Sequence, residues 1–330
     1  MLEPRVIVVT PILDDWDAFQ RLVGALNTEL AGETGRFELI AVDDGSNSPF
    51  DIRGLALPPG GAIRAVTMVR LALNLGHQRA IAVGLTEAAA RDEVDAVLVM
   101  DGDGEDRPED IPALLAQHRA APGAVIFARR ARRSEGPLFK AGVFAYRLLF
   151  RILARQSVDF GNFSLLPITA VQRLIHMAEL WNNLPATVMR SRLPYRLVAT
   201  RRGQRYAGQS KMNWIALVIH GLSAMSVYSD VIFVRLLFAA AALAVLALIG
   251  IVAAIVIRLA TDLATPGWAS TVVGVFMIVL VQLLAATVIA ALALLGGRSR
   301  RPFVPKSDCG QFVASRESLT VPAARSGAVA

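Results

Sequence analysis

The chain has 330 residues, a net charge of +7 and 54% hydrophobic residues. This length is too great for one small domain and allows a catalytic domain with an appendage. Cys309 is the single cysteine, so a disulfide within the chain and a thiolate metal cluster are both excluded. The apolar run after Arg5 is short and typical of a strand rather than of a secretory signal, so we expect the N-terminal part to stay in the compartment where it is made.

Strand and helix patterns alternate along the first 130 residues. The predicted strands cover residues 5–10, 38–42, 63–69, 95–100 and 125–128, and the predicted helices cover residues 15–30 and 77–90 and begin again at Pro108. This alternation predicts an α/β fold with a mostly parallel, Rossmann-like sheet and helices on both of its faces. Because ligands bind beyond the carboxyl ends of such strands, the predicted fold brings together the acidic residues after the second and fourth strands.

The character of the chain changes after residue 130. Residues 129–155 hold eight basic residues and one Glu among apolar residues, and this pattern predicts an interfacial amphipathic helix over about residues 135–155. Residues 190–211 hold seven further basic residues and no acid. Residues 212–231 are apolar with few charges, and we expect them to form a juxtamembrane interfacial segment.

Two long apolar runs follow, over residues 233–257 and 270–295, and each is long enough to cross a bilayer. A buried core helix is the alternative for either run, and two such runs in succession disfavour it. The loop between the runs carries Arg258, offset by Asp262. The basic residues that follow the second run are Arg298, Arg300, Arg301 and Lys306. Their excess predicts a multi-pass protein of the inner (cytoplasmic) membrane, with the catalytic domain and both termini in the cytoplasm.

These patterns predict a linear domain organisation. We expect a catalytic domain over residues 1–211, the juxtamembrane segment over residues 212–231, two transmembrane helices within residues 232–296 and a cytoplasmic tail over residues 297–330. The end of the tail is rich in small and polar residues, so we expect the tail to be disordered.

An acidic turn follows the fourth predicted strand. Asp101 and Asp103 come directly after the strand, and Glu105, Asp106 and Glu109 follow closely. Carboxylates this close repel one another unless a cation lies among them, and oxygen ligands suit a hard divalent ion that also binds a diphosphate. The alternative is an acidic helix start, which accounts for Glu109 but poorly for Asp101 and Asp103, since they precede the helix.

Two further loops carry polar groups that suit a nucleotide. Residues 43–46 (DDGS) end the second predicted strand, and their acidic side chains could accept hydrogen bonds from a ribose or a base. Residues 74–78 (NLGHQ) lead into a helix, where His77 or Gln78 could face the site. The alternatives are an ordinary Asp-Gly turn for the first loop and a plain helix cap for the second.

A basic segment, residues 205–212 (RYAGQSKM), precedes the apolar part of the chain. Its Arg205 and Lys211 lie near a flexible Gly-x-Ser turn that includes Ser210, and such a group is suited to bind a phosphate. The alternative is a juxtamembrane stretch that contacts lipid headgroups. Both alternatives make a phosphate group the partner of this segment.

In this order and at this spacing, the four motifs resemble those of the polyprenyl-phosphate glycosyltransferases of glycosyltransferase family 2, in the group of the dolichol-phosphate mannosyltransferases and the bacterial GtrB-like proteins. The DDGS loop matches the family's nucleotide-binding motif, and NLGHQRA is similar to its N-x-G-x-x-x-A segment. Residues 101–109 (DGDGEDRPE) resemble the metal-binding D-A-D-L-Q-D-P-P-E, and residues 208–211 (GQSK) resemble the G-x-S-K that meets the lipid phosphate. The resemblance runs from about Val6 through the second apolar run.

The resemblance implies a GT-A fold and a set of site residues. The residues expected to bind the nucleotide-sugar are Pro11, Asp43, Asp44, Ser46, Asn74, Gln78, Asp101 and Gly102. The residues expected to be catalytic are Asp103, Glu105, Asp106 and Asp159, and Asp101 and Asp103 are expected to bind Mg²⁺ or Mn²⁺. Arg205, Ser210 and Lys211 are expected to bind the lipid phosphate.

The chain departs from the family's pattern in several places. Residues 159–165 (DFGNFSL) resemble a G-D-F-R-L segment, but Asn162 and Ser164 stand where Asp and Arg are usual. A lost carboxylate and a lost guanidinium near the donor could alter the sugar, slow catalysis or abolish it. Asp159 remains, either as a nearby acid or as a loop residue. Residues 14–15 (DD) stand near the family's usual Asn-Glu.

The resemblance implies inverting transfer of a sugar from a nucleotide-sugar to a polyprenyl phosphate, undecaprenyl phosphate, for modification of a cell-envelope glycan. A UDP-hexose is the favoured donor and GDP-mannose is the alternative. The resemblance also implies a homo-tetramer.

Two other functions compete with this one. A degenerate family member could act as a membrane scaffold or nucleotide-sugar sensor, a hypothesis that Asn162 and Ser164 favour. A polysaccharide-extending synthase is the other rival, and the presence of two predicted spans counts against it. Nucleic acid is not an expected partner, because the basic residues cluster beside apolar segments that suit lipid.

Overall fold

The computed structural model describes residues 3–130, 148, 150–155, 160–207, 214–261, 265, 267–298 and 301–321. The chain divides into two units, and each is described by itself. The sheet unit comprises residues 1–147, 157–227 and 303–330, and the hairpin unit comprises residues 148–156 and 228–302. The chain therefore enters the hairpin unit twice and returns to the sheet unit each time.

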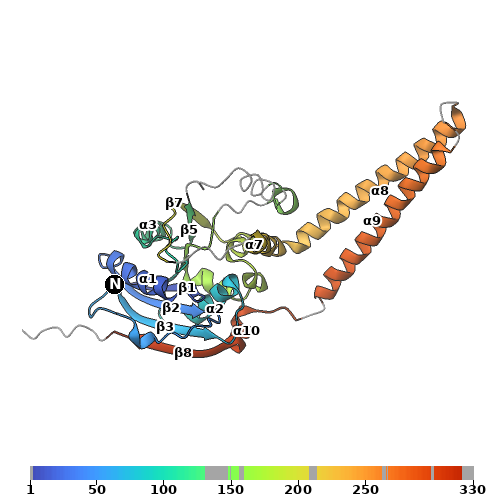
Figure 1. Cartoon of the computed structure of the whole chain (residues 1–330). Helices are drawn as coiled ribbons and strands as arrows, with labels where there is room; N and C mark the ends of the chain where they lie inside the picture. Colours follow the sequence, from blue (N-terminus) through green and yellow to red (C-terminus); the bar gives the residue numbers. More distant parts are fainter. Residues whose placement is uncertain are drawn as a thin grey trace, which may run out of the picture. The chain divides into compact units, whose positions relative to one another are not determined.

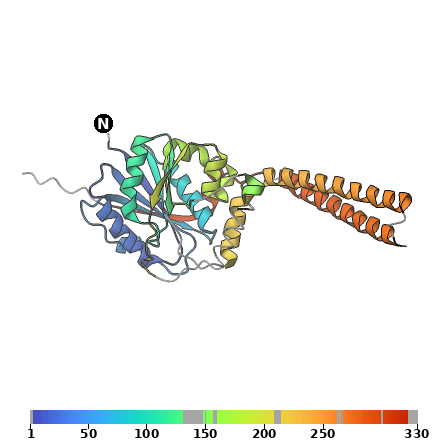
Figure 2. The same cartoon turned by 90° about the horizontal axis from the view of Figure 1, so that it is seen from above.

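Eight strands form one mixed sheet in the described part of the sheet unit (Figures 1 and 2). They are β1 (Arg5–Ile12), β2 (Arg36–Asp43), β3 (Ile63–Leu71), β4 (Ala96–Val99), β5 (Val125–Arg130), β6 (Ser164–Pro167), β7 (Tyr195–Thr200) and β8 (Val313–Thr320). Their spatial order is β7-β5-β6-β4-β1-β2-β3-β8. Strand β1 is parallel to β2 and β4, and β2 is parallel to β3, whereas β6 and β8 are antiparallel to their neighbours.

Helices cover both faces of this sheet. They are α1 (Trp16–Glu29), α2 (His77–Ala89), α3 (Ile111–Ala120), α5 (Ile168–Leu174) and α6 (Leu184–Arg190), with 3₁₀ turns at Ile52–Gly54, Pro108–Asp110, Ala178–Trp181 and Cys309–Phe312. Two further helices of this unit are α7 (Trp214–Ser226), which follows β7 in the chain, and α10 (Pro305–Asp308), which precedes β8. Because successive side chains of a strand point to opposite faces, β1 contributes to two buried clusters. Val6 and Val8 belong to a cluster with α1 and α3, and Ile7 and Val9 belong to one with α2, α5 and α6.

This architecture confirms the predicted α/β class and the parallel centre of the sheet. The five strands predicted in the first 130 residues are β1 to β5, each shifted by at most two residues at either end. The predicted helices correspond to α1, α2 and the Pro108–Asp110 turn that leads into α3. Strong local periodicity explains the agreement, since each of these segments has one or two buried faces.

The end of the chain corrects a prediction. We expected residues 297–330 to be disordered, but β8 pairs antiparallel with β3, as Figure 1 shows at the sheet edge. Before β8, the Phe303 ring lies 4.0 Å from that of Trp181, and the Cys309 side chain is buried. The alternating exposure along β8 leaves a polar face outside, which is why its composition resembles that of a disordered tail.

The buried thiol gives a direct test of this correction. Burial raises the pKa of Cys309 to about 12, and its Sγ lies 3.8 Å from the Thr86 hydroxyl on α2. Because the thiolate is the reactive form, we expect the native protein to resist an aromatic disulfide reagent at pH 8 and the unfolded protein to react within minutes. Absorbance of the released thiol measures this. Fast reaction of the native protein would mean that the tail is not docked.

The hairpin unit contains α8 (Ser229–Ala260) and α9 (Trp268–Arg298), which lie side by side in both views (Figures 1 and 2). Both are candidate membrane spans, with mean hydropathies of 3.0 in an 18-residue window of Ser229–Ala260 and 2.7 in one of Trp268–Gly297. Small residues allow the two helices to approach closely. Ala247 and Ala254 are buried, and a Cβ at Gly250 would lie 2.5 Å from the Phe276 ring.

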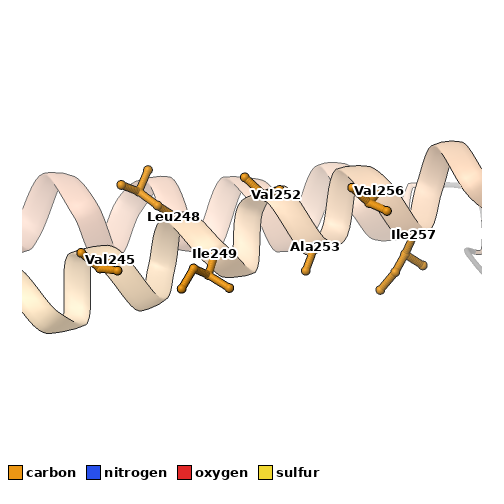
Figure 3. A pocket seen from close by; sticks show the side chains of 7 residues that line it. All are labelled: Val245, Leu248, Ile249, Val252, Ala253, Val256 and Ile257. Atoms are coloured by element: carbon orange, nitrogen blue, oxygen red, sulfur yellow. The ribbon is translucent and has the colours of Figure 1, made fainter.

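A shallow apolar hollow runs along one face of α8, as Figure 3 shows. Its lining side chains are those of Val245, Leu248, Ile249, Val252, Ala253, Val256 and Ile257. These side chains carry no group that could bind a charged nucleotide, so the site for polar chemistry is sought in the sheet unit.

Candidate active site

Loops from the carboxyl ends of adjacent parallel strands bring the predicted acidic residues to one edge of the sheet. Strand β1 lies between β2 and β4. The DDGS loop follows β2, and the acidic turn, residues 101–106, follows β4. Pro11 is in the last part of β1 between them, where its register partner on β2 is Val42. The acidic residues after β2 and β4 therefore lie at the same edge of the sheet, as the sequence predicted.

The DDGS loop is fixed by its own two carboxylates. Asp43 Oδ1 accepts from the Ser46 amide at 2.9 Å. Asp44 accepts from the amides of Leu75 at 2.7 Å and Gly76 at 2.9 Å, so it ties this loop to the one that carries Asn74. Burial raises the pKa of Asp44, and the two amide donors oppose that rise. Asp44 thus holds two predicted nucleotide-binding loops together.

A residue that the sequence left without a role also holds the DDGS loop. Asp14 Oδ1 accepts from the amides of Asn47 and Ser48, each at 2.9 Å, and its own amide donates to the Ser46 hydroxyl at 2.8 Å. The hydrogen bonds that its carboxylate accepts from Ser48 and Asn47, that of the Ser48 amide first, lower the pKa of Asp14. The sequence shows an Asp after the first strand, but it does not show which loop that Asp binds.

The acidic turn after β4 is closed by internal hydrogen bonds. Buried Asp106 accepts from the Asp101 amide at 2.9 Å, and Asp103 Oδ1 accepts from the Glu105 amide at 2.9 Å. Gly102 lies close to β1, since a Cβ there would be 3.1 Å from the Thr10 hydroxyl. The hydrogen bond that Asp106 accepts from the Asp101 amide therefore supports the shape of the turn.

Two arginines from the segment after β7 pair with the acidic turn. Arg205 Nη2 lies 2.5 Å from Asp103 Oδ2, and Arg202 Nη2 donates to both oxygens of Glu105 at 2.8 and 2.9 Å. Backbone bonds align the segments, because the Tyr206 amide donates to the Asp103 carbonyl at 2.8 Å. The structure therefore brings the predicted metal site and the predicted phosphate-binding Arg205 together.

The electrostatics of Asp103 reflect this crowding. Burial raises its pKa, and the charge of Asp101 raises it further, while the Glu105 amide and Arg205 oppose the rise. The positive charge of Arg205 thus compensates part of the negative charge of the acidic turn, which a bound cation would otherwise have to compensate.

A hydrogen-bonded relay connects α6 to the acidic turn. The Leu184 amide donates to Gln78 Oε1 at 3.0 Å, so the Gln78 amide nitrogen is free to donate to Asn162 Oδ1 at 3.0 Å. The Asn162 amide nitrogen lies 3.1 Å from His77 Nε2, and that ring nitrogen also lies 3.1 Å from Asp101 Oδ1. Since Nε2 carries at most one hydrogen, it donates to Asp101 when it is protonated and accepts from Asn162 only when it is not. Gln78 and Asn162 therefore position His77 beside the acidic turn, a role that the sequence did not reveal.

Several predicted residues lie outside the described part of the chain. They are Asp159, Ser210 and Lys211, together with residues 131–147 and 149 of the basic amphipathic segment. Ser164, the other departure from the family pattern, lies in β6 and donates to the Asn162 carbonyl at 2.8 Å.

The donor set fits a hard divalent cation in chemistry. Asp101 and Asp103 offer carboxylate oxygens on a partly buried turn, and their neighbours His77 and Arg205 show that positive charge is stabilised there. Among the described residues, no three His, Cys, Asp or Glu side chains converge on one point. Two carboxylates plus the oxygens of a bound diphosphate are a set that Mg²⁺ commonly uses.

Ligands of α/β proteins bind at an edge of this kind, beyond the carboxyl ends of parallel strands, and comparison with known proteins gives the family. Residues 7–172 match the model of glycosyl transferase family 2. The chain belongs to this family, and it is a glycosyltransferase with a GT-A-like sheet.

Its relatives are diverse. The uncharacterized glycosyltransferase YkoT of Bacillus subtilis is 27% identical over 301 residues, which cover 87% of this chain and 86% of YkoT. The dodecaprenyl-phosphate galacturonate synthase of Rhizobium johnstonii is 27% identical over 55% of this chain and 53% of its own length. The undecaprenyl-phosphate 4-deoxy-4-formamido-L-arabinose transferase of Serratia proteamaculans is 31% identical over 34% of this chain and 32% of its own length.

A solved structure with a similar sheet is the glucosyl-3-phosphoglycerate synthase of Mycobacterium tuberculosis in complex with Mn²⁺, UDP-glucose and phosphoglyceric acid. The identity is 17% and the TM-score 0.49, with 69% of this chain and 80% of that chain covered.

The position of His77 gives a testable dependence on pH. Enclosure lowers its pKa, but the charges of Asp101, Asp106 and Asp44 outweigh this, and the pKa is raised above 6.5. Protonated His77 therefore contributes stability that is fully present below pH 6.5 and is lost as the pH rises through the raised pKa. The contribution is below about 1 kcal/mol, because the side chain is 44% exposed.

We expect His77→Gln to lower the thermal midpoint at pH 6 and to have a smaller effect at pH 9, measured by scanning calorimetry in detergent. His176→Gln is the control, since its Nδ1 faces the Gln172 carbonyl rather than a carboxylate. A difference that grows with pH would contradict the assigned pairing.

Proposed function

We propose that this glycosyltransferase transfers a hexose from a UDP-sugar to undecaprenyl phosphate, with inversion, at the cytoplasmic face of the inner membrane. The observation that carries the proposal is the ion pair of Arg205 with Asp103. It joins an acidic turn that suits a metal-bound diphosphate to a basic segment that suits a phosphate. The names of the Rhizobium and Serratia relatives, which state polyprenyl-phosphate substrates, support the acceptor class. A UDP-hexose remains the favoured donor and GDP-mannose its alternative.

Each part of the site has a task in this reaction. Asp43, Asp44, Ser46, Asn74 and Gln78 form or position the loops that would receive the nucleotide. Asp101 and Asp103 would hold Mg²⁺ or Mn²⁺, which supplies charge stabilisation for the departing nucleoside diphosphate. The remaining steps, which are binding of the lipid phosphate and its attack on the sugar, depend on groups of the protein and of the two substrates.

The acceptor side needs no strong base. A phosphate monoester has a second pKa of about 6, so the attacking oxygen is already an anion near neutral pH. Arg205, which pairs with Asp103, would hold that phosphate against the donor once its guanidinium leaves Asp103, and Ser210 and Lys211 follow in the same segment. A single in-line displacement inverts the anomeric centre.

The path of the chain supports a membrane acceptor. Helix α8, the first candidate span, begins at Ser229, shortly after Arg205 in the sequence. Strand β8 follows α9 and pairs with β3, so both ends of the hairpin connect to one sheet and lie on the same side of any membrane that it crosses. The basic residues after α9 favour the cytoplasmic side.

The transfer reaction can be tested with purified protein in detergent, undecaprenyl phosphate, Mn²⁺ and a panel of labelled UDP- and GDP-sugars. We expect labelled lipid from a UDP-hexose and a loss of roughly a hundredfold or more with Asp103→Asn, because the diphosphate charge is then poorly compensated. Glu109→Gln, in the 3₁₀ turn that follows the acidic turn, is the control, since its carboxylate is half exposed and pairs with Arg107.

Each outcome has a distinct meaning. Full activity of Asp103→Asn would exclude the metal assignment. Label from GDP-mannose alone would replace the donor and keep the reaction class. Absence of label from every donor, with the wild-type protein folded, would reject the proposed transfer.

A further inference from the structure

Three charged side chains form a row across the β2, β3 and β8 edge of the sheet. Arg70 on β3 is the register partner of Asp43 on β2, and its Nη1 lies 3.3 Å from Asp43 Oδ2. Its Nε donates to Glu317 Oε1 on β8 at 3.2 Å. Glu317 lies two residues beyond Ser315, the register partner of Arg70, so Arg70 and Glu317 are diagonal neighbours on one face.

Arg70 also fixes the segment that follows the DDGS loop. Its Nη2 donates to the Phe50 carbonyl, and the Phe50 ring stacks on Trp16 at 4.7 Å between centroids. The guanidinium group is planar, so its Nε and Nη groups cannot be aimed independently. An acceptor that fixes Nε therefore also fixes the directions in which Arg70 meets Asp43 and Phe50.

Glu317 is that acceptor. Asp43 is buried and receives one hydrogen bond from the Ser46 amide, so its second oxygen is oriented by Arg70. The Arg70 side chain is 22% exposed and the Glu317 side chain is 44% exposed. The Arg70–Glu317 pair is therefore weaker than the Arg70–Asp43 pair, because solvent screens it more.

We propose that Glu317, on the strand that follows the membrane hairpin, is a positioning residue of the donor site and acts on Asp43 through Arg70. This inference rests on the proposed role of Asp43 in nucleotide binding. It makes the last strand of the chain part of the donor site, although the nucleotide would not touch it.

The neighbouring residue on β8 supplies a matched comparison. Arg316 pairs with Glu87 on α2 at 2.7 and 2.9 Å, on the exposed side of the strand. Glu87→Gln and Glu317→Gln make the same chemical change, remove the same charge and each break one ion pair between β8 and the rest of the sheet unit. Glu87 is not linked to Asp43 by any contact described above, so only Glu317→Gln should affect the donor.

The test uses the full chain in detergent, with UDP and GDP as calorimetric probes in the presence of Mn²⁺. We expect Glu317→Gln to weaken binding of the preferred nucleotide roughly three- to fivefold, the range for a partly exposed ion pair, and Glu87→Gln to leave it unchanged. In the transfer assay, KM for the donor should rise with Glu317→Gln, while kcat and KM for undecaprenyl phosphate stay the same.

A double-mutant cycle separates positioning from general stability. In an Arg70→Ala background, Glu317→Gln should cause no further loss of nucleotide affinity, because the route to Asp43 is already broken. Protection of the Cys309 thiol shows whether each variant keeps the tail docked. If Arg70→Ala does not fold, the comparison of Glu317→Gln with Glu87→Gln decides by itself.

The contrary outcomes are specific. Equal nucleotide affinity of Glu317→Gln and the wild type, or equal losses in Glu317→Gln and Glu87→Gln, would overturn the positioning role while the proposed transfer stands. A wild-type protein that binds neither UDP nor GDP would overturn both, since there would be no donor site to position.

Discussion

The concentration of negative charge at one edge of the sheet is the constraint on which the rest of the site depends. Parallel strands end side by side, so the carboxylates after β2 and β4 share a small, partly buried space. Each is stabilised by a different partner: backbone amides for Asp44, Arg70 for Asp43, His77 for Asp101 and Arg205 for Asp103. These partners come from three parts of the chain, namely Arg70 on β3, residues 75–77 and Arg205. The acidic edge therefore determines how the loops around it are arranged.

Much of the fold and the location of the site could be predicted from the sequence, because both depend on local patterns. Alternating and helical periodicities identified β1 to β5, α1 and α2, and the acids at the strand ends followed from them. The pairing of Arg205 with Asp103 joins residues far apart in the chain, and no periodicity predicts which arginine meets which carboxylate. Strand β8 was missed because its outer face is polar and its pairing with β3 spans the hairpin unit.

The departure at Asn162 also has a physical meaning that the sequence alone does not provide. A carboxylate at that position could accept from both Gln78 and His77, whereas an amide accepts from Gln78 and presents its N–H group to His77. Because His77 Nε2 can accept from this N–H group only when it carries no hydrogen, the substitution removes an acceptor that protonated His77 could have used. Ser164, the other departure, donates to the Asn162 carbonyl, so both substituted residues take part in one local network.

The place of β8 in the chain sets the order in which the molecule can be completed. The edge of β3 stays open until residues 313–320 have left the ribosome, and by then both helices of the hairpin have already been synthesised. An open strand edge is a place where chains associate wrongly, so this interval is the vulnerable stage of biosynthesis. A nascent chain that stops before the second helix lacks its last strand, and the finished sheet is therefore a sign that the whole hairpin has been made.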